Sequence, residues 1–210
     1  MIAPTFSQSN TAASFTSATS VSVTNPATVV ANEVSYLRVL ISSTNVTITW
    51  PSGWTEVSQG TEGASYTGGL AWKRLTAADG GASYTVSFSA ACTGTSRMTT
   101  FVNAKYSGIP HESATKNQGT SVSMTSSAIT TQGPDRLGVI FYTQDSTTTS
   151  TAPSGWTQQV TGTASGTRNY VDTKAIAAPT TEAAVTRTIT SASWITFSLA
   201  VLPEQRVFLL

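Results

Sequence analysis

The sequence predicts an all-β protein, a β-sandwich or jelly-roll-like fold built from two internally repeated halves. Three observations lead to this prediction. Polar and apolar residues alternate in many short segments, no segment has a convincing helical periodicity, and six blocks of sequence recur in the same order in both halves. Each half has room for roughly six to eight short strands, which is the size of a sandwich unit.

The alternation is clearest in three segments. VTITW at 46–50 alternates apolar residues with threonine, and YTVSFS at 84–89 alternates apolar residues with threonine and serine. In WITFSLAVL at 194–202, one face is predicted to carry Ile195, Phe197, Leu199 and Val201, and the other Trp194, Thr196, Ser198 and Ala200. Threonine and β-branched residues suit a pleated, half-buried surface. WKRLTAADGG at 72–81 has room for one helical turn before its glycines end it.

The internal repeat is visible when the halves are set side by side. The recurrence of six blocks in order indicates duplication of one fold unit, because Ser/Thr-rich sequence produces a single match by chance more readily than an ordered series. The alignment matches Leu37 with Leu137, Val39 with Val139 and Lys73 with Lys174. The blocks are 19–27 with 120–128, 36–41 with 136–141, 51–55 with 153–157, 69–78 with 170–179, 83–91 with 184–192, and 99–110 with 195–203.

The pentapeptide PSGWT occurs in both halves, at 51–55 and 153–157. Proline restricts one backbone angle and glycine adopts a conformation that other residues resist, so PSG predicts a tight turn. The tryptophan after it can fold back over the end of a sandwich core, or it can serve as an exposed platform for sugar rings. The predicted turn and core residues are Pro51, Gly53, Trp54, Pro153, Gly155 and Trp156.

The repeat divides the chain into an N-terminal arm (1–13), two β-sandwich repeats (14–111 and 112–203) and an apolar tail (204–210). Whether the repeats form two sandwiches or merge into one is left open. The tail is expected either to fold back on its own domain or to insert into a neighbouring subunit. The candidate partner-binding residues at the two ends are Ile2, Phe6, Val207, Phe208, Leu209 and Leu210.

The surface is polar but nearly uncharged. Only 10% of residues are charged, against about 25% in typical domains, whereas 29 serines and 39 threonines supply the polarity. A net charge of +1 and scattered basic residues argue against nucleic-acid binding and charge-driven membrane binding. There is no apolar stretch of membrane-spanning length and no secretory signal pattern.

The sequence predicts no enzyme, no cofactor and no metal site. Cys92 is the single cysteine and is expected to be buried, and His111 is the single histidine and is expected in a loop, without a catalytic role. Ten acidic residues are spread along the chain without a spacing that pairs them, and no nucleophile elbow, phosphate loop or calcium loop is present. Lys73 and Lys174 are expected to be solvated strand residues.

Three of these motifs carry a resemblance to a known family. PSGWT, the LAWKRL strand at 70–75 and YSGI at 106–109 resemble the P-x-G-W-T pattern of duplicated, Ser/Thr-rich β-sandwich proteins encoded among phage and prophage structural genes. The resemblance covers about residues 15–203 and departs from the pattern at NEVSY (32–36) and GPDRL (133–137), where an acidic-glycine turn is more usual. It transfers no catalytic residues.

The resemblance implies a virion component that is assembled in the host cytoplasm. We expect a capsid decoration (cement) protein, a homo-oligomer that binds other virion proteins through its ends and its neutral sandwich surfaces. The alternative is a tail or fibre module that binds a receptor or carbohydrate, with Tyr66, Trp72, Tyr170 and Trp194 as candidate sugar platforms. Exposure distinguishes the two, because sugar platforms are exposed rings whereas packing rings are buried.

Overall fold

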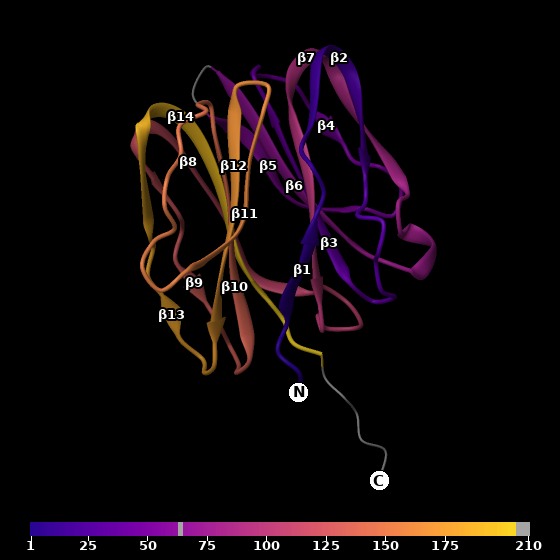
Figure 1. The fold of residues 1–210 in the computed structure, drawn as a ribbon, viewed down its shortest axis with the longest axis vertical. Coiled ribbons are helices and arrows are strands. Elements are labelled where there is room, and N and C mark those ends of the chain that lie inside the picture. Colours follow the sequence, from indigo (N-terminus) through magenta and orange to yellow (C-terminus); the bar gives the residue numbers. More distant parts are fainter. Residues whose placement is uncertain (63–64, 205–210) are drawn as a thin grey trace.

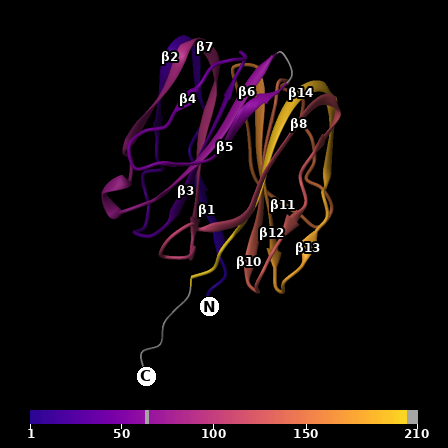
Figure 2. The same cartoon turned by 180° about the vertical axis from the view of Figure 1, so that it is seen from behind.

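The computed structural model describes residues 1–62 and 65–204 and is built almost entirely from antiparallel strands. Two sheets pack against each other (Figures 1 and 2), so the predicted all-β sandwich of two halves is confirmed. The helical structure within the described residues is one 3-10 turn, η1 (Ala77–Asp79), in the segment where the sequence leaves room for a single turn. Those residues contain no helix long and apolar enough to cross a membrane.

The first sheet is formed by the N-terminal half of the chain. Its strand order is β1-β7-β3-β6-β5, and β2 and β4 also pair with β7. The strands are β1 (Thr5–Ser9), β2 (Ala13–Thr24), β3 (Val34–Ile41), β4 (Ile48–Thr49), β5 (Thr55–Glu62), β6 (Tyr66–Arg74) and β7 (Ser83–Val102).

The second sheet repeats this topology. Its order β11-β12-β10-β14-β8 corresponds strand for strand to β5-β6-β3-β7-β2 of the first sheet, and β9 and β13 form a separate two-stranded pair. The strands are β8 (His111–Thr125), β9 (Ile129–Thr130), β10 (Arg136–Gln144), β11 (Thr157–Ala164), β12 (Thr167–Ile176), β13 (Thr181–Glu182) and β14 (Thr186–Val201). The duplicated sequence blocks therefore correspond to a duplicated order of pairing.

The register of the sheets corrects one of the sequence matches. Counted from the PSGW turns, Trp72 and Thr173 occupy equivalent positions, opposite the first residues of β5 and β11. Trp72 pairs with Tyr36, whereas Thr173 pairs with Val139, so Val139 is the counterpart of Tyr36 and not of Val39. The match of Leu37 with Leu137 is wrong for the same reason. An odd shift of register moves a side chain to the other face of a strand.

Three hydrophobic cores follow from this pairing. The central core lies between the two sheets and includes Tyr36, Phe101, Phe141 and Phe197. Each half also has an outer core, where the long strand of the half and its partner cover the other face of the sheet. The question left open by the sequence is therefore answered: each half has its own core, and a shared core joins them. All eight residues of β3 are buried because both of its faces are covered.

Residues near the N-terminus join the first sheet. β1 pairs with β7, with Thr5 opposite Val102 and Ser9 opposite Thr99. Phe6 packs against the central core, and its ring lies edge-on to the Phe101 ring with the ring centres 6.2 Å apart. Residues 5–9 therefore do not form a free arm. Their incorporation covers backbone groups of β7 that would otherwise be an open sheet edge.

Candidate functional site

The two PSGW turns have the same geometry. The Trp54 N–H donates to the Pro51 carbonyl and the Trp156 N–H to the Pro153 carbonyl, each at 3.1 Å. The glycines at the third position, Gly53 and Gly155, have φ of 81° and 77°, the left-handed backbone that a type II turn requires. Both indoles are 8% exposed and pack in the outer cores. The repeated pentapeptide thus closes an outer core in each half.

The two matched lysines are ion-paired, so the expectation that they are simply solvated is wrong. Lys73 Nζ lies 2.5 Å from Asp79 Oδ1 and donates to the Tyr84 hydroxyl at 2.7 Å. Lys174 Nζ lies 2.5 Å from Glu182 Oε2. The carboxyl of Asp79 is partly buried, which raises its pKa, but bonds from Lys73, Thr76 and Tyr84 outweigh this effect and hold the pKa well below its usual range.

The outer core of the second half contains a buried ion pair that the sequence did not reveal. The Arg187 side chain donates to both oxygens of Asp172, with Nε to Oδ2 at 2.9 Å and Nη2 to Oδ1 at 2.5 Å. Both side chains are fully buried, and the guanidinium lies 4.0 Å from the centre of the Tyr170 ring. Burial raises the pKa of the Asp172 carboxyl, while the bonds from Arg187 oppose that shift. The pair is enclosed in protein and is therefore structural.

His111 opens strand β8 and does not lie in a loop, in contrast to the sequence expectation. Its Nδ1 lies 3.1 Å from the Tyr36 hydroxyl, and its ring meets Trp72 edge-on. Burial lowers the pKa of the imidazole to about 4, so the ring is neutral at pH 7. The imidazole therefore packs at the edge of the central core.

The candidate sugar-platform rings do not form an exposed surface. Tyr170 and Trp194 are buried in the outer core of the second half, and Trp72 and Tyr66 are half-buried against the central core. By the exposure criterion stated above, these rings serve packing. Cys92 is buried and free, with its thiol directed to the Ala18 carbonyl at 3.5 Å, as expected.

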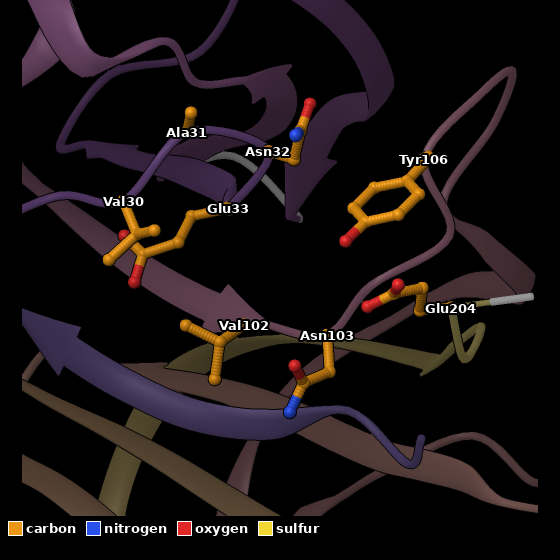
Figure 3. A pocket seen from close by; sticks show the side chains of 8 residues that line it. All are labelled: Val30, Ala31, Asn32, Glu33, Val102, Asn103, Tyr106 and Glu204. Atoms are coloured by element: carbon orange, nitrogen blue, oxygen red, sulfur yellow. The ribbon is translucent and has the colours of Figure 1, made fainter. Parts of the chain in front are cut away.

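A pocket lies at the end of the molecule where the chain begins and where the described residues end (Figures 1 and 3). Its volume is about 130 Å³, room for roughly four water molecules and well below the size of a typical cofactor site. The lining residues are Val30, Ala31, Asn32, Glu33, Val102, Asn103, Tyr106 and Glu204.

Backbone hydrogen bonds hold the loops around this pocket. The segment that joins the halves is bonded to the end of the second half through Lys105 N to the Leu202 carbonyl and Glu204 N to the Asn103 carbonyl. Asn32 and Asn103 have φ of 73° and 58°, a left-handed conformation that asparagine tolerates better than most residues. The pocket is therefore built from the linker, the loop before β3 and the end of the second repeat.

Two buried carboxylates line the pocket. Glu33 accepts a hydrogen bond from the Ser7 hydroxyl at 2.8 Å, and its other oxygen, Oε2, has no hydrogen-bond partner in the structure. Figure 3 shows the Glu204 carboxylate and the Tyr106 ring on the same side of the pocket. The lining residues include no serine, cysteine, histidine or lysine, so the ionisable groups of the pocket are the Glu33 and Glu204 carboxylates and the Tyr106 hydroxyl.

Exposed apolar side chains occur in the segments that build the pocket and beside them. Val30 is 64% exposed, Ile109 60%, Met1 59% and Tyr106 50%. Val30 and Tyr106 line the pocket, Ile109 belongs to the same linker as Tyr106, and Met1 precedes Ile2, whose N–H donates to the Glu204 carbonyl at 3.4 Å. We call these four residues the terminal face. The remaining large apolar residue of comparable exposure among the described residues, Val122 at 55%, lies in β8.

The candidate partner-binding residues are distributed differently from the expectation. Ile2 lies beside the terminal face, bridged to Glu204, whereas Phe6 packs within its own chain. Val207, Phe208, Leu209 and Leu210 lie outside the described residues. Sequence reasoning missed Val30, Tyr106 and Ile109 as surface residues, although it noted YSGI at 106–109 as a motif.

Residues 1–62 and 65–204 contain no group of three or more histidine, cysteine or acidic side chains placed to hold a metal ion. Comparisons of the chain with protein-family models, curated proteins and solved structures gave no match.

Proposed function

We propose that this chain is a structural protein of a bacteriophage virion, a capsid decoration protein that binds neighbouring virion subunits through its terminal face. The observation that carries the proposal is the terminal face itself. Val30 and Tyr106 line the pocket and Met1 and Ile109 belong to segments next to it, in a molecule whose other large apolar residues are mostly buried. Contiguous exposed apolar surface marks sites of protein–protein contact.

The surroundings of the terminal face support a docking role over a catalytic one. The pocket beside it is small, and the loops around the pocket are fixed by backbone hydrogen bonds. A fixed surface loses little conformational entropy on binding, so a modest apolar contact can give useful affinity. Repetition of that contact on a symmetric shell would add strength through multivalency.

The phage assignment rests on the PSGWT, LAWKRL and YSGI motifs, and it places the chain in the assembled particle. Quantitative mass spectrometry of purified virions of the encoding phage tests it. We expect the chain at a constant ratio to the major shell protein after washing. Absence from the particles would overturn the assignment.

The role of the terminal face is tested by sedimentation velocity from 1 to 200 µM, the range being chosen for weak self-association. We expect the unmodified chain to form a homo-oligomer, and Val30→Glu and Ile109→Glu to shift it to monomer because each buries a charge in the contact. Val122→Glu is the matched control, since it alters an equally exposed valine on β8. A monomer throughout, or equal effects of all three substitutions, would refute the role.

A further inference from the structure

Two buried arginines face each other at the boundary of the two halves, and no carboxylate of the described residues pairs with either. Arg38 on β3 is paired directly with Arg97 on β7, and both side chains project from the inner face of the first sheet toward the second. Arg38 is 3% exposed and Arg97 is 7% exposed. Neither belongs to an ion pair in the structure. Like charges directly opposite on neighbouring strands destabilise a sheet, and burial increases the cost.

The hydrogen bonds of Arg38 use only one side of its guanidinium. Its Nη1 donates across the boundary to the Tyr142 carbonyl at 2.7 Å and to the Tyr170 carbonyl at 3.1 Å. Its Nε and Nη2 groups are buried and have no partner. These two N–H groups form the fork that arginine presents to a bidentate or bridging acceptor.

Further unpartnered donors lie close by. The Nε of Arg97 is buried without a partner, and the guanidinium of Arg97 lies over Gly162 of β11, where there is no side chain to occupy the space. The Nδ2 of Asn169 is also buried and has no hydrogen-bond partner. Asn169 precedes Tyr170 on β12, and Arg38 donates to the carbonyls of Tyr170 and of its cross-strand partner Tyr142. All four unsatisfied atoms at this place are donors, and three of them belong to the two arginine side chains.

Among the described residues, no acceptor completes this set. Buried polar groups in folded proteins are almost always satisfied, and two buried cations need a negative charge more than they need water. Desolvation, together with the nearby charge of Arg97, lowers the pKa of Arg38 to about 9. A bound anion would offset the unfavourable energy of both effects.

We propose that Arg38 and Arg97, with Asn169, bind a small inorganic anion of the size of chloride between the two halves. Both arginines are buried, which favours a small anion over a nucleotide or a sugar phosphate. The anion would be held by donors from both halves, so its binding would stabilise the sandwich as a whole. This site is independent of the terminal face and of the proposed function.

The first test measures thermal unfolding while sodium chloride replaces sodium gluconate at constant ionic strength. A ligand that binds only the folded state raises the midpoint in a saturable way. We expect a saturating rise of several degrees for the unmodified chain and its loss in Arg97→Met. Arg168→Met is the matched control, because Arg168 lies on β12 and donates to the Thr147 carbonyl instead of facing Arg38. A rise that does not saturate, or that persists in Arg97→Met, would overturn the proposal.

The second test does not depend on stability. Crystals grown in sodium bromide should show anomalous scattering within about 3.5 Å of Arg38 Nη2, the distance range of hydrogen bonds to a halide. The peak should be absent in Arg97→Met crystals. Bromide found only on the surface, with water or nothing beside Arg38, would also overturn the proposal.

Discussion

The buried Arg187–Asp172 pair gives the sharpest energetic prediction. Replacing Asp172 with alanine leaves the Arg187 charge fully buried with only the Ser150 carbonyl at 3.0 Å and the Gln158 side-chain oxygen at 3.0 Å as acceptors. The two charge-assisted bonds at 2.9 and 2.5 Å are lost together. Removal of one partner from a buried pair costs about 3–5 kcal/mol, and we expect a loss of stability in that range for Asp172→Ala.

The equivalent position in the first half shows that an apolar residue can replace Asp172. Ala71 occupies the position in the first half that Asp172 occupies in the second, since they pair with Glu56 and Gln158 at equivalent places after the two turns. An apolar residue is therefore compatible with this position. The double variant Asp172→Ala with Arg187→Met should be more stable than Asp172→Ala alone, because no uncompensated charge remains.

Equilibrium unfolding in urea measures both effects, and a double-mutant cycle gives the coupling energy. Glu182→Gln is the control, because it breaks the more exposed Lys174–Glu182 pair and should cost no more than about 1 kcal/mol. The reasoning is refuted if Asp172→Ala costs less than about 1 kcal/mol, or if the two substitutions are additive.

Three further predictions concern the imidazole and the repeated glycines. NMR titration of the single histidine should give a pKa near 4, and a pKa above 6 would contradict the burial of the ring. Because the pKa in the unfolded chain is about 6.5, the free energy of unfolding should fall by up to about 3 kcal/mol as the pH drops from 6.5 to 4. His111→Gln should remove that part of the pH dependence. Gly53→Ala and Gly155→Ala should each cost about 1 kcal/mol in urea unfolding, because both glycines have positive φ and a Cβ at either position meets no clash. Ser52→Ala should have little effect, and unequal costs of the two glycine substitutions would refute the equivalence of the turns. Gly162→Ala should lower the free energy of unfolding more than Gly60→Ala. A Cβ at position 162 meets the buried Arg97 side chain, whereas a Cβ at position 60 meets the end of the Lys116 side chain, which can move aside. The reverse order of the two costs would contradict this packing.

Much of the fold could be predicted because alternation and repetition are local properties of the sequence. The prediction of two matched PSGW turns needed only Pro51, Gly53 and their counterparts, since turn geometry depends on adjacent residues. The faces of 195–201 were also correct: Ile195, Phe197 and Leu199 all lie in the central core.

The rest depends on contacts between distant segments. The match of Leu37 with Leu137 failed because both strands are buried on both faces, so an apolar pattern does not define their register. Arg187 and Asp172 are 15 residues apart, and no spacing rule pairs them across two strands. The terminal face joins Val30 to Tyr106, which the pairing of β3 with β7 brings together.

The central claim is that the terminal face is the assembly surface, and hydrogen–deuterium exchange tests it most directly. Exchange is compared between dilute monomer and concentrated oligomer, with peptides that cover 27–33, 103–110 and 119–125. The account predicts that the first two become protected on association while 119–125, which contains Val122, does not change. Protection confined to 119–125, or no change in 27–33 and 103–110, would contradict it.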